Sequence, residues 1–465
     1  MSFPVDVVVM AAGKGTRMKS QRPKVLHRLG GRALAQHVID RAVRLSARSV
    51  VVITGHGAEQ VEQGLSVSDG AALRFVRQEP QLGTGHAVQQ AVPLLADDGV
   101  VLVLNGDVPL IGQETLEALL QACAGKYLTL LSVDTGADAT GYGRIVRGDD
   151  GSVRAIVEHK DADATQRRIT EWYSGVMAVP ADVLKPLLAE LGNDNSQGEY
   201  YLTDVVKHAV ARGLQVQAIT TSDEVQVAGV NSPVQLAELE RAYQRRLAEA
   251  LMEQGVRLAD PARLDVRGEL MCAPDVEIDV NCVFEGRVKL GEGVRIGANC
   301  VIANAAIDAG AVIHPFTHID GEKLGVSVGR GALVGPFARL RPGAQLGAEV
   351  HIGNFVEVKN SILADGAKAN HLAYLGDTTV GERVNYGAGS ITANYDGANK
   401  HRTVIEADVH VGSNCVLVAP VTIGAGGTVG AGSTVTKDTA PGSLTVARGK
   451  QISLPNWQRP AKQKP

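Results

Sequence analysis

An apolar, mostly aliphatic side chain recurs at every sixth position through much of the second half of this 465-residue chain. Three runs share this spacing: Ile278, Phe284, Leu290, Ile296 and Ile302; Val328, Val334, Leu340, Leu346, Ile352 and Val358; and Ile405, Val411, Leu417, Ile423, Val429 and Val435. A period of six fits neither the 3.6-residue repeat of an α-helix nor the alternation of an isolated strand. It is typical of a hexapeptide β-helix, in which each short strand points one side chain into a stacked core.

The six-residue spacing breaks twice, between Ile302 and Val328 and between Val358 and Ile405. We expect the coil to take insertions or bulges at both places. The second break contains a cluster of polar side chains, namely His371, Tyr374, Asn385, Asn394 and Lys400. This irregular stretch is therefore the candidate site of the second half.

Length and charge bound the class of protein. The chain is too long for one ordinary core, so two or more domains are expected. A formal net charge of −4 supplies no overall basic field for nucleic acid or acidic lipid. We therefore expect no nucleic-acid partner.

Five scattered cysteines form no Cys-x-x-Cys pair, which argues against a disulfide framework and against a structural zinc site. The N-terminal residues have neither the basic region nor the long apolar region of a signal peptide. No segment approaches the roughly 18 uncharged apolar residues of a membrane helix. We expect no stable membrane insertion and a cytoplasmic location.

The first half alternates strand-like and helix-like segments. Val5–Met10, Val50–Thr54 and Val100–Leu104 are short apolar runs, as in parallel strands that are buried on both faces. A helix is predicted near Ala33–Leu45. This rhythm predicts a mostly parallel α/β sheet, with ligands at the carboxyl ends of its strands.

Three segments divide the chain. Residues 1–232 form the predicted α/β domain, and residues 233–255 form a connector helix that begins at Pro233 and ends at Gly255. Residues 256–465 form the β-helix domain. Its repeat begins near Arg263, and the tail after Arg448 is expected to be loose.

A glycine-rich loop, residues 11–18, follows the first predicted strand. Its small residues allow a close approach to a phosphate, and Lys14 and Arg17 supply positive charge. The loop is not a Walker A motif, and Met18 stands where a GxGxxG motif has its third glycine. Taken alone, such a loop is a plain structural turn about as often as a phosphate site.

Further motifs favour the phosphate site. Pro23-Lys24 follows the loop, and residues 81–86 form a second glycine-rich loop. Asp107 comes directly after a predicted buried strand, where a carboxylate suits Mg²⁺ if the ligand carries phosphates. An isolated aspartate there would more often be a helix cap or a turn residue.

The motifs AAGKGTRM, PKVL, QLGTGHA and GDVPL, in that order, resemble the sugar-nucleotidyltransferase (pyrophosphorylase) family. With the hexapeptide half attached, nearly the whole chain resembles the bacterial enzymes that combine N-acetylglucosamine-1-phosphate uridyltransferase with glucosamine-1-phosphate acetyltransferase. The resemblance implies an α/β, Rossmann-like nucleotidyltransferase domain followed by a left-handed parallel β-helix. It also implies a role in making UDP-N-acetylglucosamine for peptidoglycan and lipopolysaccharide.

For uridylyl transfer the resemblance implies UTP and N-acetylglucosamine 1-phosphate as substrates and Mg²⁺ as cofactor. The UTP residues would be Met10, Ala11, Ala12, Gly13 and Lys24, with Gln78, Gly83 and Thr84 at the uracil. Arg17 would stabilise charge on the transferring phosphoryl group, and Asp107 and Asn231 would bind Mg²⁺. Gly143, Glu158 and residue 173 would hold the sugar, although Tyr173 replaces the asparagine that the family usually has there.

For acetyl transfer the resemblance implies glucosamine 1-phosphate and acetyl-CoA as substrates, with His371 as the general base. Arg341, Lys359 and Lys400 would lie near the sugar phosphate, and Tyr374 and Asn385 on the sugar. Acetyl-CoA would contact Ala388, Asn394, Tyr395, Ser413, Ala431 and Arg448. A lone histidine is more often structural, and basic residues on a β-helix are mostly a solvated surface.

The resemblance also implies a homotrimer with the acetyl sites at subunit junctions, which is reasonable for flat-sided prisms. The left-handed coil comes from the resemblance alone, since a period of six does not fix the hand and right-handed crossovers are the rule.

Two alternatives remain. The first is a single-activity nucleotidyltransferase for glucose 1-phosphate or mannose 1-phosphate, in which the β-helix serves only for assembly. The second is a regulatory or scaffold subunit. A scaffold should lose its charged site residues, whereas Lys24, Asp107, Glu158, Asn231 and His371 are all present.

Overall fold

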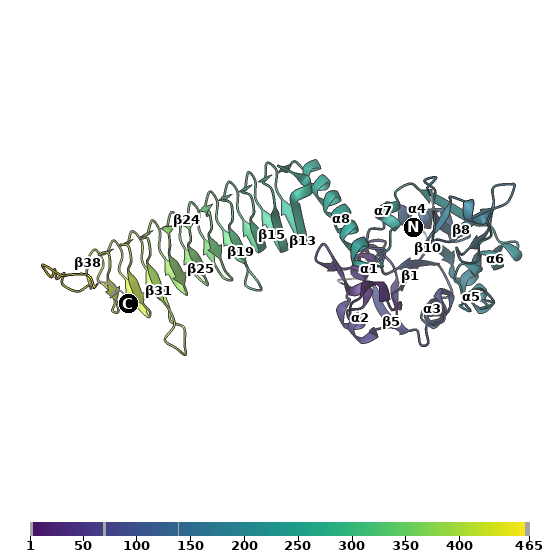
Figure 1. The fold of residues 1–465 in the computed structure, drawn as a ribbon, viewed down its shortest axis with the longest axis horizontal. Coiled ribbons are helices and arrows are strands. Elements are labelled where there is room, and N and C mark those ends of the chain that lie inside the picture. The colour runs from purple at the N-terminus through teal and green to yellow at the C-terminus, as the bar shows by residue number, and fades with distance from the viewer. Residues whose placement is uncertain (1–2, 68–70, 138, 461–465) are drawn as a thin grey trace, which may run out of the picture. The chain divides into compact units, whose positions relative to one another are not determined.

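The computed structural model describes residues 3–67, 71–137 and 139–460. The chain divides into two compact units, Met1–Gln244 and Arg245–Pro465 (Figure 1). The predicted connector helix is α8 (Pro233–Glu253), which crosses this division. Among the described residues, no helix combines the length and the apolar character needed to cross a membrane.

A mostly parallel sheet forms the first unit, with strand order β11-β7-β10-β6-β1-β4-β5. Its strands are β1 (Val5–Met10), β4 (Ser49–Thr54), β5 (Ala72–Arg77), β6 (Val100–Asn105), β7 (Leu128–Val133), β10 (Trp172–Pro180) and β11 (Val216–Thr221). β10 is the exception, because it runs antiparallel to both β6 and β7. A hairpin of β8 (Arg144–Arg147) and β9 (Val153–Val157) pairs with its beginning. The three predicted strands are therefore confirmed.

Helices cover both faces of this sheet. They are α1 (Leu34–Arg44), α2 (Ala58–Gly64), α3 (Thr84–Ala91), α4 (Gln113–Cys123), α5 (Ala181–Ala189), α6 (Asp204–Ala211) and the short α7 (Glu224–Val227). Val7 and Val9 of β1 belong to the core that packs on α1 and α4, whereas Val8 belongs to the core on α3, α5 and α6. Because successive side chains of each strand enter different cores, the strands read as continuous apolar runs. In β1, β4 and β6, polar side chains are therefore confined to positions at or next to the strand ends.

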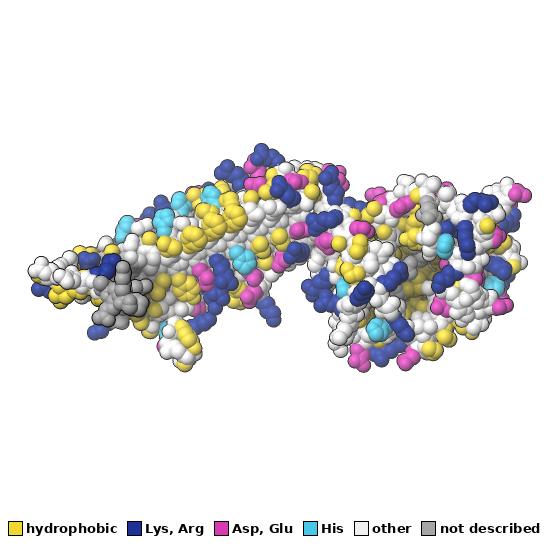
Figure 2. All heavy atoms as spheres, viewed as in Figure 1, with side chains coloured by type: hydrophobic (Ala, Val, Ile, Leu, Met, Phe, Trp, Pro, Cys, Tyr) yellow, Lys and Arg dark blue, Asp and Glu magenta, His cyan; other side chains and the backbone are white. Residues whose placement is uncertain are grey.

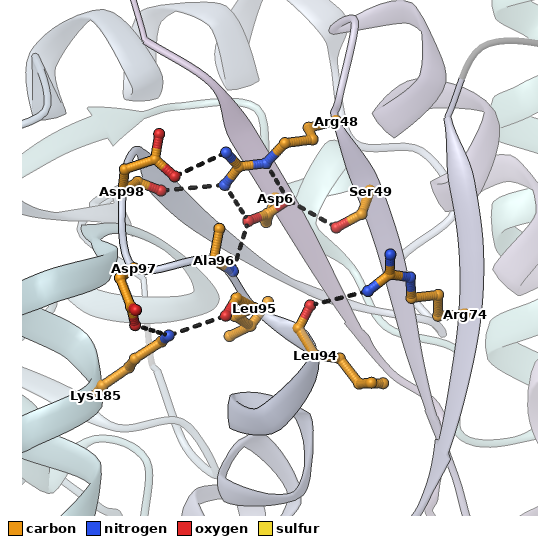
Figure 3. A network of polar contacts seen from close by, with 10 residues as sticks. All are labelled: Asp6, Arg48, Ser49, Arg74, Leu94, Leu95, Ala96, Asp97, Asp98 and Lys185. Atoms are coloured by element: carbon orange, nitrogen blue, oxygen red, sulfur yellow. Dashed lines mark hydrogen bonds and ion pairs between the residues drawn. The ribbon is translucent and has the colours of Figure 1, made fainter.

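A polar network fixes the amino ends of β1 and β4 (Figure 3). The carboxylate of Asp6, only 2% exposed, accepts hydrogen bonds from Arg48 Nη2 at 2.6 Å and Ser49 Oγ at 2.7 Å. Arg48 also donates to Asp98 at 2.8 Å. Burial alone would raise the pKa of Asp6, but the hydrogen bonds from Arg48 and Ser49 outweigh it and lower the pKa.

The second unit is a parallel β-helix whose short strands stack on three faces (Figure 1). The first face holds β12 (Arg257–Leu258), β14 (Glu277–Ile278), β16 (Arg295–Ile296), β18 (Val312–Ile313), β21 (Leu333–Val334), β24 (His351–Asn354), β27 (Lys368–His371), β30 (Asn385–Tyr386), β33 (His410–Val411), β36 (Thr428–Val429) and β38 (Leu444–Thr445). The second face holds β19 (His318–Asp320), β22 (Arg339–Leu340), β25 (Glu357–Lys359), β28 (Tyr374–Gly376), β31 (Ile391–Ala393), β34 (Val416–Val418) and β37 (Thr434–Val435). The third holds β20 (Val326–Val328), β23 (Gln345–Leu346), β26 (Ile362–Leu363), β29 (Thr378–Val380), β32 (Thr403–Ile405) and β35 (Val421–Ile423). The long strands β13 (Leu264–Cys272), β15 (Cys282–Leu290) and β17 (Val301–Ile307) start the second and third faces.

Every residue of the three six-residue runs is buried in one continuous core. The predicted hexapeptide β-helix is therefore confirmed. The runs do not stop at the second break, however, because buried rungs continue at Leu363, Ala369, Leu375, Val380, Tyr386 and Thr392. Two five-residue steps shorten these coils, so that Asn354 lies 17 residues before its stacked neighbour His371.

The true insertions are short and lie at one corner of the coil. Residues 321–325 separate β19 from β20, and residues 394–402 separate β31 from β32. In the second insertion Tyr395 and Lys400 form an antiparallel bridge, so the segment is a small hairpin. Beyond β38 the described tail forms no helix or strand. The predicted breaks were therefore correct in kind, but the second is narrower than the sequence suggested.

Replacing Arg48 with methionine should destabilise the first unit by about 3 kcal/mol, because the buried carboxylate of Asp6 loses its cation. Since the folded-state pKa of Asp6 is lowered, its contribution is present above the unfolded pKa near 4 and is lost as the pH falls through the folded value. The gap between the parent and R48M should therefore shrink below about pH 4. Urea unfolding from pH 3.5 to pH 7 measures it.

Arg154→Met is the matched control, because its pair with Asp150 is exposed and should contribute under about 1 kcal/mol. Equal losses in the two variants would contradict the assigned role of Arg48.

Candidate functional sites

A cleft of about 890 Å³ opens at the carboxyl ends of β1, β4, β5 and β6. Most of the predicted nucleotide residues line it: Met10, Ala11, Ala12, Gly13, Lys24, Gln78, Gly83, Thr84 and Asp107. The structure therefore brings together two glycine-rich loops that lie some 70 residues apart in the sequence, as Gln81 Nε2 shows by donating to Ala12 O at 2.5 Å. Gln81 has no predicted role, although its position in the second loop was a signal.

The cation-binding candidates converge in this cleft. The Lys24 ammonium contacts Asp107 Oδ2 and donates to Asn231 Oδ1 at 3.1 Å. The side-chain oxygens of Asp107 and Asn231 therefore converge on one point, which the Lys24 nitrogen occupies. A backbone hydrogen bond from Val230 N to Asp107 O, 2.9 Å long, holds the segments that carry these two side chains together. No cluster of three or more His, Cys, Asp or Glu side chains suited to a metal occurs among the described residues. One carboxylate and one amide oxygen nevertheless fit Mg²⁺, which takes its other ligands from phosphates and water.

The second glycine-rich loop is shaped by backbone contacts. Gln78 is buried and its Nε2 donates to Gly83 O at 2.9 Å. Gly83 has a φ of 112°, and a Cβ there would lie 2.6 Å from Tyr200 O. The positive φ and the lack of space beside Tyr200 therefore each exclude a side chain at residue 83.

The predicted sugar residues lie outside the lining of this cleft. Glu158 accepts a 3.0 Å hydrogen bond from Thr203 Oγ1, and burial raises its pKa. Gly143 O accepts from Tyr173 N at 2.9 Å, and a Cβ on Gly143 would lie 3.7 Å from the Glu158 carboxyl. The three are therefore neighbours. Arg17 is exposed on the 3₁₀ turn Thr16–Met18 and does not line the cleft.

Tyr173 is buried in the core between the sheet and α3, α5 and α6. Among the described residues its hydroxyl has no hydrogen-bond partner. Burial, with the nearby charge of Glu158, raises the pKa of Tyr173 well above its usual value. Thr203, the partner of Glu158, has no role in the sequence prediction and no sequence signal marked it.

In the second unit a column of residues runs along the corner between the first and second faces. His371 stacks directly on Asn354, and its Nδ1 lies 2.9 Å from Asn354 Oδ1. Backbone bonds carry the stack onward, with Asn414 N donating to Ala388 O and Gly432 N to Ser413 O, both at 2.8 Å. The column ends where Arg448 Nη1 donates to Ala431 O at 2.8 Å. Five predicted residues thus share this corner: His371, Ala388, Ser413, Ala431 and Arg448.

A pocket of about 300 Å³ lies at the next corner, between the second and third faces. It is lined by Glu322, Leu324, Arg341, Pro342, Lys359, Asn360, Asp377 and Lys400. Both insertions reach it, the first through Glu322 and Leu324 and the second through Lys400. The ammonium of Lys400 is the main cause that lowers the pKa of Lys359, with smaller effects from partial burial and Arg341. Such crowded cations are typical of an anion site.

The remaining predicted residues lie on the first face, on the second face and on the hairpin of the second insertion. Tyr374 lies on β28 between the two corners, with its hydroxyl over Gly376, where a Cβ would be 2.3 Å from it. Asn385 is exposed on β30. Asn394 is buried and donates to Asp377 Oδ2 at 2.5 Å, whereas Tyr395 is exposed on the hairpin. One copy of the chain therefore holds the His371 column and the lysine pocket at different corners, with β28 between them.

The fold and these sites define a nucleotidyltransferase domain joined to a hexapeptide-repeat transferase. Family models agree, since residues 7–258 match the MobA-like NTP transferase domain and residues 402–437 match the bacterial transferase hexapeptide (six repeats). The bifunctional protein GlmU of Polaromonas sp. (strain JS666) is 73% identical over 477 residues, covering 99% of both chains. The proteins of that name from Acidovorax sp. (strain JS42) and Azoarcus sp. (strain BH72) are 70% and 55% identical, covering 99% of this chain and 99% and 100% of those proteins.

The chain belongs to the GlmU family of bifunctional proteins. It is an enzyme with a uridyltransferase half and an acetyltransferase half.

Replacing Lys24 with methionine should tighten binding of a divalent cation to the nucleotide-free protein by roughly tenfold, because Asp107 and Asn231 lose the ammonium that contacts both. Electron paramagnetic resonance of Mn²⁺ measures free against bound cation. Lys19→Met, an exposed lysine, is the control, and the tighter site should vanish in Lys24→Met/Asp107→Asn. Unchanged Mn²⁺ affinity in K24M would contradict this picture.

Proposed function

We propose that the chain makes UDP-N-acetylglucosamine in two steps. Its second unit transfers the acetyl group of acetyl-CoA to glucosamine 1-phosphate. Its first unit then transfers a uridylyl group from UTP to N-acetylglucosamine 1-phosphate and releases pyrophosphate. The observation that carries the proposal is that one chain holds both a nucleotide cleft with a cation-binding pair and, in its second unit, a histidine column and a basic pocket at neighbouring corners.

In the uridylyl step, an oxygen of the sugar 1-phosphate attacks the α-phosphorus of UTP, and the bond to the departing pyrophosphate breaks. Catalysis then depends on positioning and charge. Met10, Ala11, Ala12 and Gly13 would lie against the phosphates, Lys24 and Arg17 would neutralise them, and Gln78, Gly83 and Thr84 would hold the uracil. Gly143 and Glu158 would hold the sugar.

Asp107 and Asn231 would hold Mg²⁺, which when bound neutralises phosphate charge. The Lys24 ammonium contacts both of these side chains, so it would lie close enough to the metal site to contact the bound phosphates.

In the acetyl step, the amine of glucosamine 1-phosphate attacks the thioester carbonyl. The carbon–nitrogen bond forms, the carbon–sulfur bond breaks, and the amine proton passes to His371 as coenzyme A leaves. Asn354 Oδ1 can only accept a hydrogen bond, so it holds the proton of His371 on Nδ1 and leaves Nε2 free as the base. Asn354 is therefore a positioning residue that the sequence did not indicate.

Arg341, Lys359 and Lys400 would bind the sugar phosphate, and Tyr374 and Asn385 the sugar. Ala388, Ser413, Ala431 and Arg448 would form a groove for acetyl-CoA along the His371 column, with Asn394 and Tyr395 as further contacts. Support comes from the regular stack of that column, which offers an extended ligand one straight edge.

A homotrimer would complete the acetyl sites. Phe316, Phe337, Phe355 and Leu372 form an exposed apolar corner, and Figure 2 shows apolar side chains gathered along the coiled unit. The three rings stack with centroids 5.0 and 5.4 Å apart. Each of the four residues has a φ between 50° and 61°, which is strained for such side chains. Exposed aromatic rings on a strained backbone, at the corner where Leu372 follows His371, support burial against another copy.

A coupled assay tests the proposal. The protein receives glucosamine 1-phosphate, acetyl-CoA, UTP and Mg²⁺, and chromatography should detect UDP-N-acetylglucosamine together with pyrophosphate. Omitting acetyl-CoA should abolish the product unless N-acetylglucosamine 1-phosphate is supplied. Pyrophosphate release that ignores acetyl-CoA and prefers glucose 1-phosphate would favour the single-activity alternative instead.

Asp107→Ala and His371→Ala should separate the two activities. Removing Asp107 should slow pyrophosphate release by about 100-fold or more at saturating Mg²⁺, because the metal loses its carboxylate. Removing His371 should slow acetyl transfer by about 100-fold or more, because general bases contribute this much. Each variant is the control for the other, since each should keep the untouched activity. Loss of both activities in either variant would argue against independent sites.

Replacing Phe355 with aspartate should dissociate the proposed trimer, because the middle of the apolar corner would carry a charge. Light scattering coupled to size-exclusion chromatography should report three chains for the parent and one for F355D. Glu349→Asp, at another corner of the same coil, is the control and should keep the parent's mass. A parent that elutes as a monomer would overturn this part of the proposal.

A further inference from the structure

The three predicted sugar residues, Gly143, Glu158 and Tyr173, include no side-chain amide. The acetamido group of N-acetylglucosamine presents one acceptor, its carbonyl oxygen, and one donor, its N–H. Glu158 is a suitable acceptor for the N–H, but residue 173 is a tyrosine whose hydroxyl is buried in the core. A side-chain amide donor for the carbonyl oxygen therefore has to come from another residue.

The pairing of β6 with β10 brings a different carboxamide, that of Asn105, to this place. β6 pairs antiparallel with β10, with Met177 opposite Val103, and the same register extended two residues puts Asn105 opposite Gly175. β8 pairs with the beginning of β10, with Trp172 opposite Arg144, which puts Gly143 opposite Tyr173. β7 occupies the other edge of β10. Asn105 and Gly143 are therefore consecutive neighbours on one edge, about 7 Å apart along the strand.

The backbone makes room for the Asn105 side chain. Gly175 has a φ of 87°, and a Cβ there would lie 2.1 Å from Asn105 Nδ2. The register of β10 on β7 also shifts between Tyr173 and Met177. This bulge changes the direction of β10 at the position of Gly175. Only glycine at residue 175 leaves the carboxamide its position.

The Asn105 amide is available to a ligand. Asn105 lines the nucleotide cleft and is half-buried. Among the residues that the structure describes, its Nδ2 donates a single hydrogen bond, a long one of 3.4 Å to Gly175 O. A half-buried amide with weak internal bonding gains most when a ligand oxygen replaces that bond.

We propose that Asn105 determines specificity for the N-acetyl group, by donating from Nδ2 to the acetamido carbonyl oxygen while Glu158 accepts from the N–H. The carboxamide expected at residue 173 is thereby supplied across the β6–β10 pairing. This inference rests on the proposed uridylyl transfer and names the sugar contact of that same site.

Pyrophosphate release by the full-length protein tests it, with Mg²⁺ and saturating UTP, and with N-acetylglucosamine 1-phosphate and glucose 1-phosphate compared as substrates. In Asn105→Ala, kcat/KM for the acetylated sugar should fall about tenfold or more, the value of one hydrogen bond from a half-buried amide. With glucose 1-phosphate, which lacks the acetamido group, kcat/KM should fall less than about twofold. The KM for UTP should stay within about twofold. Asn193→Ala, an exposed asparagine outside the cleft, is the matched control.

Two further variants separate specificity from folding. Asn105→Leu keeps about the size of the side chain and adds no charge but loses the donor, so it should show the same selective loss. Tyr173→Asn introduced into Asn105→Ala restores a carboxamide from β10 and should recover at least about threefold of the lost kcat/KM. Equal losses for both sugars, or no selective loss in either single variant, would overturn the proposal. A parent protein that releases no pyrophosphate with either sugar would instead overturn the proposed function on which it rests.

Discussion

The inward stack of aliphatic side chains in the second unit sets what the rest of that unit can do. Each coil must return its rung to the same internal column, so a coil takes 17 or 18 residues unless an insertion leaves the wall at a corner. Rungs such as Leu340, Leu375 and Leu417 are completely buried. Because the interior is filled, chemistry is possible only on the outer faces and corners. The His371 column and the lysine pocket both lie at corners for this reason.

A comparable constraint shapes the first unit. Helices cover both faces of its sheet, so polar side chains are excluded from the centres of β1, β4 and β6 and gather at the ends of these strands. The Asp6–Arg48 network fixes the amino ends of β1 and β4, and the nucleotide cleft lies at the opposite, carboxyl ends. The antiparallel strand β10 adds an irregular edge, where Asn105 lies opposite Gly175 and Gly143 lies opposite Tyr173. In both units, the regularly packed segments stabilise the fold, and the irregular segments carry the candidate binding sites.

The sequence was sufficient wherever a function depends on a short motif or a period. Val5–Met10 is the first strand as predicted, and the glycine-rich loops line the cleft. It failed where a partner is distant and bears no motif. Asn354 faces His371 only because coils of 17 residues place them in register. The rungs between Val358 and Ile405 are not recognisable as a six-residue repeat in the sequence, because two steps are only five residues long and some rungs are alanine or threonine.

The sequence by itself determined the two fold classes, because hydrophobic periodicity is a local property that survives without knowledge of contacts. It also determined the family, through motifs whose order and spacing are specific. Only the tertiary structure decided which polar groups meet. Lys24, Asp107 and Asn231 converge across more than 200 residues, and Asn105 lies beside Gly175 through strand pairing. Such contacts arise from register and packing between elements, which no single segment encodes.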